Sequence, residues 1–388
     1  MERLVTSNLK LGIIAGGQLG KMLIQEASKW DIITYVLDND EECPARNIAS
    51  HYIKGNHLDF DSVYQFGKMV DLLTFEIENV HIEAIKKLKS EGVRVIPDPD
   101  ILALIQDKGL QKQFYKGNGI PTSKFKIYDS KFDIVNDIKN GKLNYPFVQK
   151  LRKGGYDGRG VAVINGQDDL KKLLPGASII EEKVEIAKEI SVIVARNKKG
   201  EIKCYPVVEM LFDPTANLVD KLICPSSITI EQSEKAVNFA SEIIELLTME
   251  GLLAVEFFVD SNGDVIVNEM APRPHNSGHH TIESIITSQF EQHLRAILNL
   301  PLGSTKIKLP SVMINILGDK GFEGPVVYEG LTESMAIEGV KIHLYGKKTT
   351  KPYRKMGHIT VLASSLECAL KKAEKVKQLI RVKSWKLN

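Results

Sequence analysis

Residues 252–270 read LLAVEFFVDSNGDVIVNEM, two apolar runs separated by a short polar segment. The aspartates, asparagine and glycine of the polar segment are typical of a hairpin turn, so the two runs are predicted to be antiparallel strands. In such a hairpin we expect Glu256 and Glu269 to lie side by side on one face. Two like charges among apolar strands are costly to bury unless a cation lies between them. The hairpin therefore predicts a Mg²⁺ site with Asn268 adjacent and nucleotide phosphates as further ligands. The alternative is an amphipathic hairpin whose glutamates face solvent.

A glycine-rich loop lies upstream of this hairpin. Residues 145–150 (YPFVQK) are a predicted strand that ends at Lys150, and residues 154–160 (GGYDGRG) contain four glycines in seven positions. Such a loop has a mobile backbone that can close over phosphates. Lys150 offers a point charge to a phosphate, and Arg159 offers a planar fork to a carboxylate, phosphate or bicarbonate. The alternative is a flexible polar loop, which would not require Tyr156, Asp157 and Arg159.

The segment directly after Glu269 concentrates polar side chains. Residues 270–281 (MAPRPHNSGHHT) contain an arginine, an asparagine and three histidines. Zinc is one interpretation of His275, His279 and His280. The sequence has no HExxH motif, however, and prolines disfavour a helix here. Hydrogen bonding of Arg273, His275 and Asn276 to an anionic substrate is therefore the favoured interpretation, and we expect His280 and His293 to be structural.

The first hundred residues alternate apolar runs with helical patterns. Residues 11–15, 32–37, 72–76 and 93–96 are predicted strands, and apolar residues from Leu19 to Trp30 recur at helical spacing. This alternation predicts a parallel, doubly wound sheet. The turn at 15–20 (AGGQLG), with Asp38 after the next strand, half-matches a dinucleotide fingerprint in which Ala15 replaces the first glycine. NAD, another phosphate-bearing ligand at the helix N-terminus, and a turn without a ligand all remain open.

Two further segments are candidates for ligand binding. Residues 179–184 (IIEEKV), with Glu189 nearby, offer backbone groups and a carboxylate to an adenine edge and a ribose, or form a charged surface turn. Residues 345–358 (YGKKTTKPYRKMGH) form a basic loop that could hold a substrate phosphate, although each lysine alone is typical of a solvated surface. We expect strands near 190–195 and 203–210, and helices over about 100–117, 230–247 and 365–380.

Composition limits the class of protein. The chain has 388 residues, 43% hydrophobic and 26% charged, with a formal net charge of +2. This balance is ordinary for a globular protein and argues against a nucleic-acid-coating role. Four scattered cysteines without a CxxC pair predict reduced thiols in a cytosolic protein. The start lacks a signal-peptide pattern, and no apolar run reaches the length of a membrane span. We therefore expect a cytoplasmic protein with neither nucleic-acid nor membrane partners.

Together these motifs resemble the ATP-grasp superfamily, and within it the 5-(carboxyamino)imidazole ribonucleotide synthetases of purine biosynthesis. The resemblance covers essentially the whole chain, and the combination of GGQLG, YDGRG and HNSGH is specific to this family. The motifs are GGQLGKM (16–22), TFEIENV (74–80), YDGRG (156–160), HNSGH (275–279), SQFEQHLRAILNLP (288–301) and KMGHIT (355–360). The implied fold is α/β and α+β. It comprises an N-terminal doubly wound parallel-sheet domain (1–98), a central ATP-grasp domain pair (99–300) and a small C-terminal α/β module (301–388). The ATP-grasp pair is expected to divide into a lid subdomain at about 120–180 and a larger one at about 181–300.

The resemblance also implies roles for individual residues. Glu256 and Glu269 are implied Mg²⁺ ligands, and Lys347 and Arg354 an implied grip on a substrate phosphate. The implied ATP contacts are Lys108, Lys150, Glu181, Glu182, Val184, Glu189 and Asn268. The implied pocket for aminoimidazole ribonucleotide and bicarbonate consists of Glu78, Tyr156, Asp157, Arg159, Arg273, His275 and Asn276, with Gly17, Gln18 and Leu19 from the first turn. Two positions depart from the family pattern: Tyr353 replaces a glycine, and His280 replaces an aromatic residue.

The implied activity is ATP-dependent carboxylation of aminoimidazole ribonucleotide by bicarbonate through carboxyphosphate. The resemblance further implies a homodimer, with possible transfer of the product to a downstream mutase. Another ATP-grasp ligase, a formate-using transferase or a dehydrogenase would differ in acceptor or cofactor. A non-catalytic nucleotide sensor is disfavoured because both candidate metal carboxylates and the glycine-rich loop are present.

Overall fold

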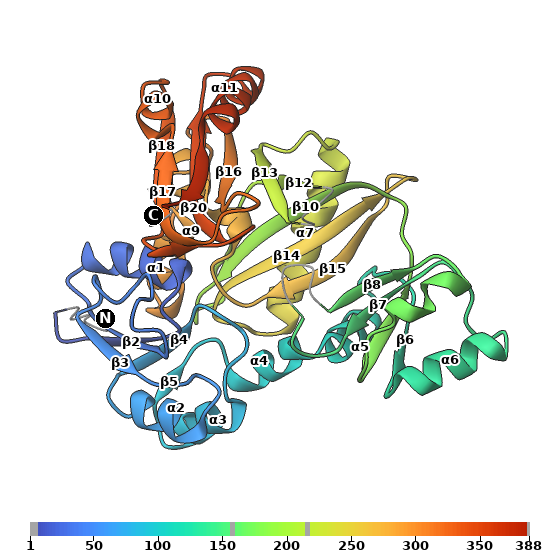
Figure 1. The fold of residues 1–388 in the computed structure, drawn as a ribbon. Coiled ribbons are helices and arrows are strands. Elements are labelled where there is room, and N and C mark those ends of the chain that lie inside the picture. Colours follow the sequence, from blue (N-terminus) through green and yellow to red (C-terminus); the bar gives the residue numbers. More distant parts are fainter. Residues whose placement is uncertain (1–6, 156–159, 214–217, 386–388) are drawn as a thin grey trace.

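The computed structural model describes residues 7–155, 160–213 and 218–385. Within these ranges the chain forms four sheets. Figure 1 shows the N-terminal unit at the lower left, a small sheet at the lower right, a long central sheet between them and the C-terminal module at the top. This mixed architecture confirms the expected fold class. The expectations for Tyr156, Asp157 and Arg159 concern residues outside the described ranges.

The N-terminal unit is a five-stranded parallel sheet, as the strand–helix alternation predicts. The strand order is β3-β2-β1-β4-β5, and the carboxyl ends of the strands share one edge. Its strands are β1 (Lys10–Ile14), β2 (Ile33–Asp38), β3 (His51–Lys54), β4 (Leu72–Phe75) and β5 (Arg94–Val95), and its helices are α1 (Gln18–Ser28), α2 (Phe60–Gly67) and α3 (Ile82–Ser90). Strand β3 was not predicted from the sequence, because this short edge strand has no fully buried residue and so lacks an apolar run.

The single helix expected over about 100–117 is wrong, because the segment contains two helices. These are α4 (Pro99–Gln106) and α5 (Lys108–Gly117). Asp107 separates them in an extended conformation, with φ −114° and ψ 107°. Its side chain accepts hydrogen bonds from Gly109 N at 2.8 Å and Leu110 N at 3.3 Å. An aspartate in this position caps a new helix instead of continuing the old one.

The small sheet at the lower right of Figure 1 is antiparallel and four-stranded. Its strand order is β6-β9-β7-β8, and its core contains Phe147, Ile164 and Ile180. Helix α6 (Lys131–Lys139) contributes Ile134 to this core. The strands are β6 (Phe125–Tyr128), β7 (Phe147–Leu151), β8 (Val161–Ile164) and β9 (Ser178–Glu182).

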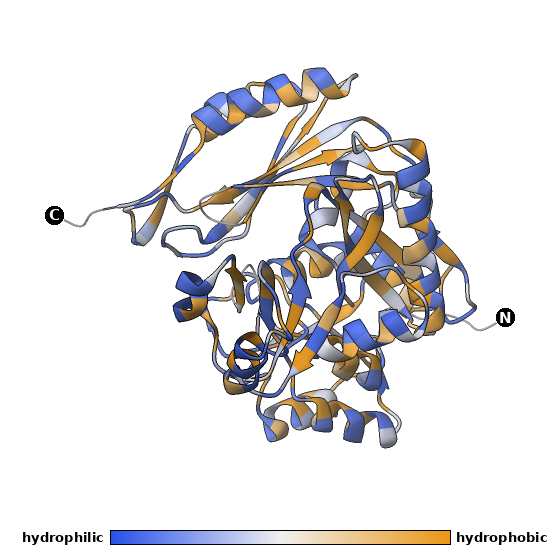
Figure 2. Cartoon of the chain, turned by 90° about the vertical axis from the view of Figure 1, so that its right-hand side faces the viewer, coloured by the Kyte–Doolittle hydropathy of each residue, from blue (hydrophilic) through white to orange (hydrophobic). Residues whose placement is uncertain are grey.

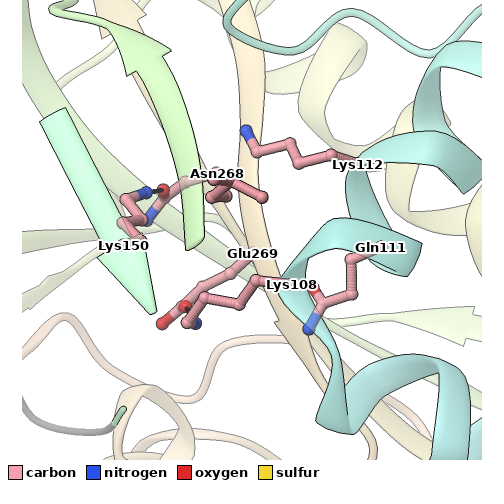
Figure 3. A pocket seen from close by; sticks show the side chains of 7 residues that line it. Lys108, Gln111, Lys112, Lys150, Asn268 and Glu269 are labelled. Carbon is pink, nitrogen blue, oxygen red and sulfur yellow. Dashed lines mark hydrogen bonds and ion pairs between the residues drawn. The ribbon is translucent and has the colours of Figure 1, made fainter. Parts of the chain in front are cut away.

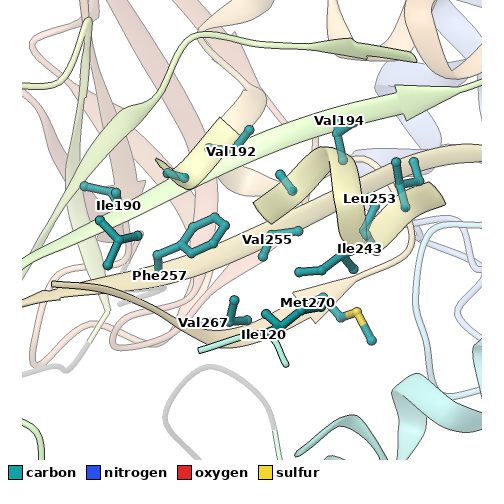
Figure 4. Packing of buried hydrophobic residues seen from close by; sticks show 14 of the residues in the cluster. Ile120, Ile190, Val192, Val194, Ile243, Leu253, Val255, Phe257, Val267 and Met270 are labelled. Carbon is teal, nitrogen blue, oxygen red and sulfur yellow. The ribbon is translucent and has the colours of Figure 1, made fainter. Parts of the chain in front are cut away.

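The central sheet has nine strands and includes the predicted hairpin. Its order is β15-β14-β10-β12-β13-β16-β20-β18, and β11 also pairs with β10. Helix α7 (Ile230–Leu246) packs its apolar face, including Ala236 and Ile243, against β10 and β14. Figure 4 shows this core, in which Val192, Val255 and Phe257 belong to the same cluster as Ile243 of α7. The strands up to β15 are β10 (Ile186–Arg196), β11 (Ile202–Cys204), β12 (Val208–Phe212), β13 (Val219–Cys224), β14 (Gly251–Asp260) and β15 (Val265–Ala271).

The hairpin of β14 and β15 pairs Glu256 directly with Glu269, which confirms that the two carboxylates lie side by side. A β-bulge is needed for this register. Val267 pairs with Phe257 and Glu269 with Glu256, so Asn268 is an extra residue on β15. Strict alternation would place Asn268 opposite Glu256 and turn Glu269 toward the core.

The C-terminal module continues the same sheet, because β16 pairs with β13. Figure 2 shows α11, the long helix at the top of the view, carrying both polar and apolar residues. Its apolar residues Ala369, Ala373 and Val376 pack with the buried side chains of β16 and β20. The elements of this part are α8 (Thr281–Ser284), α9 (Gln289–Ile297), β16 (Ser311–Leu317), β17 (Gly324–Glu329), α10 (Leu331–Met335), β18 (Val340–Leu344), β19 (Thr349–Thr350), β20 (Lys355–Leu362), α11 (Leu366–Leu379) and β21 (Arg381–Ser384). In the described parts of the chain, no helix is long and apolar enough to span a membrane.

Candidate active site

The centre of the site is the carboxylate pair on the central sheet. Burial, and then the neighbouring Glu269 carboxylate, raise the pKa of Glu256 well above its ordinary value. The Lys108 ammonium lowers the pKa of Glu269. His275 Nε2 lies 3.5 Å from Glu256 Oε1. Two carboxylates paired on one face of a hairpin are the oxygen donors that a hard divalent cation accepts.

The described residues contain no group of three histidine, cysteine, aspartate or glutamate side chains arranged to hold a metal. Mg²⁺ does not require such a group, because it is commonly held by one or two carboxylates plus water and substrate phosphates. Glu256 and Glu269 therefore fit Mg²⁺ with nucleotide phosphates. The zinc interpretation of His275, His279 and His280 finds no support, since zinc needs a compact set of protein ligands.

Two lysines from separate elements converge on the bulged strand (Figure 3). Lys108, the first residue of α5, forms an ion pair with Glu269. Lys150 on β7 donates to Asn268 Oδ1 at 2.8 Å and pairs with Glu181 Oε2 at 2.6 Å. Burial opposes the charge of Lys108, but Glu269 outweighs this effect and raises its pKa. The lysine ammonium groups would bind phosphates, and the carboxylates would bind Mg²⁺. In this structure the lysines are paired with the acidic and amide side chains instead.

A buried lysine missed in the sequence completes this cluster. Lys112 forms an ion pair with Glu181 and donates to Thr122 Oγ1 at 2.6 Å and Ser123 Oγ at 3.0 Å. Burial lowers the pKa of Lys112 to about 8. Burial works against the charged form of Glu181, but Lys150 and Lys112 outweigh it and lower the pKa of Glu181 to about 2. The available sequence signal was helical spacing, since Lys112 lies one turn after Lys108 on α5.

The predicted adenine and ribose contacts do not all point into this site. Glu189 lies on β10, and burial raises its pKa to about 7. Glu189 also lines a recess of about 250 Å³ together with Lys188, Glu209 and Met210. Glu182 instead carries a side chain that is 64% exposed and pairs with Lys124 at 3.3 Å. Val184 lies between β9 and β10, where its backbone remains a candidate contact.

Beside the carboxylate pair is a group of hydrogen-bond donors. Arg273 Nη2 pairs with Glu78 Oε1 at 2.7 Å, and His275 Nδ1 contacts Ser277 Oγ at 2.9 Å. Arg273 Nε and Asn276 Nδ2 are buried and have no hydrogen-bond partner among the described residues. Buried donors without acceptors are costly, so they indicate a place for an anionic or carbonyl-bearing ligand.

At the first glycine turn the structure supplies its own carboxylates. Glu76 accepts from Gly17 N at 2.7 Å and also from Gly20 N, so it occupies part of the α1 N-terminus. Burial raises the pKa of Glu76 to about 7. Asp38 accepts from Gly16 N at 2.7 Å, so the carboxylate that a dinucleotide ribose would need is already engaged. The NAD interpretation therefore loses its support, whereas the first-turn amides of Gln18 and Leu19 remain candidate contacts.

The basic loop of the C-terminal module docks onto this turn. Lys21 on α1 donates to the carbonyl oxygens of Leu344 at 3.0 Å and Tyr345 at 3.2 Å. Lys347 donates to Lys355 O at 2.8 Å, and Arg354 donates to Thr349 O at 2.9 Å. The two candidate phosphate contacts, α1 and the basic loop, are thus neighbours in the fold although they are more than three hundred residues apart.

His280 and His293 are buried and hydrogen-bonded within the fold, in line with the expected structural role. His280 Nδ1 contacts Ser284 Oγ at 2.7 Å, and His293 Nε2 contacts Thr74 Oγ1 at 2.9 Å. Burial lowers the pKa of each to about 3. His279 stacks on His358 with ring centroids 4.7 Å apart, and His358 stacks on His343 at 4.5 Å.

Three family models match successive segments of the chain. A family model of the ATP-grasp domain matches residues 113–290, and one of the ribonucleotide synthetase preATP-grasp domain matches residues 9–106. A third model, the phosphoribosylaminoimidazole carboxylase C-terminal domain, matches residues 311–372. With the paired lysines and carboxylates described above, these matches define an ATP-grasp enzyme.

Individual relatives indicate one family within the ATP-grasp enzymes. The N5-carboxyaminoimidazole ribonucleotide synthase of Bacillus subtilis is 33% identical over 93% of each chain. The chloroplastic phosphoribosylaminoimidazole carboxylase of Vigna aconitifolia is 37% identical over 92% of this chain, but this chain spans only 64% of its length. The N5-carboxyaminoimidazole ribonucleotide synthetase structure from Thermotoga maritima matches with a TM-score of 0.89 at 44% identity, covering 97% of this chain and 100% of that one. The chain belongs to the family of N5-carboxyaminoimidazole ribonucleotide synthases, which are ATP-grasp ligases.

A further similar structure was solved with ligands bound. The Aspergillus clavatus N5-carboxyaminoimidazole synthase, in complex with ADP and 5-aminoimidazole ribonucleotide, matches with a TM-score of 0.87 at 31% identity. The match covers 96% of this chain and 99% of that chain.

Proposed function

We propose that this chain uses ATP and bicarbonate to carboxylate 5-aminoimidazole ribonucleotide, giving N5-carboxyaminoimidazole ribonucleotide, ADP and phosphate. The observation that carries the proposal is the pair of buried donors without acceptors, Arg273 Nε and Asn276 Nδ2. They belong to the same segment as His275, whose Nε2 lies 3.5 Å from Glu256 Oε1. Family membership and the relative that binds ADP and 5-aminoimidazole ribonucleotide support the same assignment.

The first chemical step would activate bicarbonate, which is a poor electrophile. A bicarbonate oxygen attacks the γ-phosphorus of ATP, the bond to the β-phosphate oxygen breaks, and ADP leaves with carboxyphosphate as the product. Lys108 and Lys150 would bind the phosphates and offset the charge on the transferred group. Mg²⁺, held by Glu256 and Glu269, would supply further charge neutralisation at the phosphates.

In the second step the exocyclic amine of the ribonucleotide forms a bond to the carboxyl carbon, or to CO₂ released from carboxyphosphate. The carbon–oxygen bond to phosphate breaks, and the amine proton passes to the departing phosphate. Arg273 and Asn276 would orient bicarbonate and its adduct through their buried donors. Lys347, Arg354 and the α1 turn would hold the ribonucleotide phosphate, since a backbone N-terminus and basic side chains both favour an anion. Glu78, His275, Tyr156, Asp157 and Arg159 stay predicted members of this pocket. Glu182 stays a predicted ATP contact, and its exposed side chain leaves the backbone as the contacting group.

The testing experiment is ADP release from Mg-ATP and ¹³C-bicarbonate, with and without 5-aminoimidazole ribonucleotide. We expect ADP release to depend strongly on the ribonucleotide and ¹³C to appear in the product. Turnover without that dependence, or with formate replacing bicarbonate, would favour another ATP-grasp acceptor. ATP binding without turnover would favour a nucleotide sensor.

Glu269→Gln is the decisive variant, because it preserves shape and removes one carboxylate charge. We expect the loss of ATP turnover, and near-normal turnover would contradict the metal assignment. A homodimer and product transfer to a downstream mutase stay predictions from family resemblance. A cytoplasmic location stays a prediction from composition and cysteine usage.

A further inference from the structure

Each of the two lysines proposed to bind the phosphates of ATP, Lys108 and Lys150, is already paired with a side chain of the bulged strand. Lys108 contacts the Glu269 carboxylate, while Lys150 contacts the amide oxygen of Asn268 and the carboxylate of Glu181. The two ammonium groups therefore differ in partner. Only Lys108 is in direct contact with a carboxylate of the candidate metal pair.

We propose that Lys108 is the counter-ion of the Glu256–Glu269 pair in the nucleotide-free protein, so that a divalent cation occupies the pair only after nucleotide phosphates draw Lys108 away. This inference rests on the proposed ATP-dependent function, and it adds an order of binding to it. Lys108 then has two partners in turn, a carboxylate before nucleotide binding and a phosphate afterwards.

The charge arrangement supports this exchange. Glu256 and Glu269 lie opposite each other in the hairpin register, and such a pair needs a nearby positive charge to be buried. The Lys108 ammonium supplies that charge at Glu269, the position that a divalent cation would require. Lys108 and the cation would repel each other there, so the two occupants exclude one another.

The backbone of Lys108 is fixed, so the exchange requires only the side chain to move. Lys108 N donates to Arg152 O at 2.9 Å, and the preceding residue, Asp107, makes two bonds to Arg152 at 2.9 and 2.7 Å. The long lysine side chain, with several rotatable bonds, can reorient from this anchored base. A phosphate that enters the site offers it a strong alternative partner.

The test measures Mn²⁺ binding without nucleotide by electron paramagnetic resonance, because free Mn²⁺ gives a distinct signal and accepts oxygen ligands like those of Mg²⁺. In the wild-type protein we expect weak binding alone and tight binding with ADP. Lys108→Gln and Lys108→Met should tighten nucleotide-free Mn²⁺ binding by about tenfold or more, the usual size of a coupling between two ligands. Lys108→Arg, which keeps the charge, should not.

Lys150→Gln is the matched control, since it removes one positive charge from the same cluster but not from Glu269. If Lys150→Gln tightened Mn²⁺ binding as much as the Lys108 variants, the proposal would be overturned. The overall positive charge of the cluster, and not the contact of Lys108 with Glu269, would then control cation binding. No change in either Lys108 variant, with thermal unfolding like that of wild type, would overturn it as well. If wild type binds no Mn²⁺ even with ADP, the metal pair itself is wrong and the proposal falls with it. Ribonucleotide-dependent ADP release, measured separately, would show whether the proposed carboxylation also fails.

Discussion

In the described parts of the chain, five non-glycine residues have a positive φ, and two of them lie at the candidate phosphate contacts. Ala15 has φ 70° and Tyr353 has φ 63°. Both stand where the sequence patterns led us to expect glycine, the first in the α1 turn and the second before Arg354. A side chain at positive φ is strained because Cβ approaches the backbone. Ala15 and Tyr353 thus keep the backbone turn that glycine would adopt, at some cost in stability. The loops that carry the candidate phosphate contacts therefore retain their conformation.

We predict that Tyr353→Gly is more stable than Tyr353→Ala. Both variants remove the ring, which is 38% exposed, but only glycine relieves the strain at φ 63°. The difference should be about 1 kcal/mol, or roughly 1 °C in the melting midpoint of a chain of this size. Differential scanning calorimetry of the two variants provides the measurement. Equal midpoints would mean that position 353 carries no backbone strain.

The buried His280 predicts a pH-dependent contribution to stability. Its pKa is lowered to about 3 by burial, so below the unfolded value of about 6.5 the unfolded chain binds a proton that the folded chain does not. Folding stability from this residue is therefore lost as pH falls below 6.5. We predict that the free energy of unfolding of His280→Phe rises relative to that of wild type by up to about 1.4 kcal/mol for each pH unit below 6.5.

The readout is the difference between the variant and wild type in chemical unfolding from pH 7.5 to 5. The total curve is less informative, because Glu76 and Glu189 have raised pKa values and act in the opposite direction. Ser284 Oγ still donates to His280 O at 2.9 Å in the variant backbone, so no buried hydroxyl loses its acceptor. A pH-independent difference would contradict the prediction.

At the scale of elements, the site depends on irregularities in otherwise regular structure. The bulge at Asn268 turns both Asn268 and Glu269 toward the site, and the break at Asp107 starts α5 at Lys108. An unbroken helix would carry Lys108 in its interior, and an unbulged strand would bury Glu269.

We predict that the cap and the ion pair of Asp107 can be separated by two variants. Asp107→Asn keeps an N-cap for α5 but weakens the two hydrogen bonds from Arg152, at 2.9 and 2.7 Å. Asp107→Ala loses the N-cap as well as the two hydrogen bonds from Arg152. The alanine variant should lose about 1 kcal/mol more stability than the asparagine variant. Both should raise KM for ATP by displacing Lys108. Steady-state kinetics combined with thermal unfolding test this, and an unchanged KM in both would separate Asp107 from the site.

At the scale of the whole molecule, the ATP-grasp part and the C-terminal module share one sheet. Strand β16 pairs with β13 in register, from Lys221 opposite Ile314 to Cys224 opposite Ser311. The stacked rings of His279 and His358 cross the same junction. The basic loop therefore stands on a continuous support that reaches back to the carboxylate hairpin.

We predict that a chain ending at residue 310 does not form a stable ATP-binding core. Removing β16 leaves β13 as an open edge and exposes apolar side chains such as Leu222, now 1% exposed. An unpaired apolar edge promotes aggregation. Size-exclusion chromatography and ADP titration of the shortened chain provide the test. A monomeric, ADP-binding product would show that the two parts are independent.

The alternating strands and helices of the N-terminal unit, the hairpin with its two glutamates and the family could all be predicted from the sequence. Each of these predictions depends on periodicity, turn residues or motifs that span only a few residues. The sequence also led to the candidate lysines and the donors of residues 273–276. Their roles in binding stay predictions.

Which groups meet could be learned only from the three-dimensional fold. It brought Lys108 to Glu269, Lys112 to Glu181, and Lys21 to the basic loop, each across a long stretch of chain. It also placed the Glu76 carboxylate on the α1 amides, where sequence alone left room for a phosphate or NAD. The physical reason is that pairing of charges and burial of donors depend on distance in space, and a one-residue bulge or helix break can change that distance without altering the local pattern.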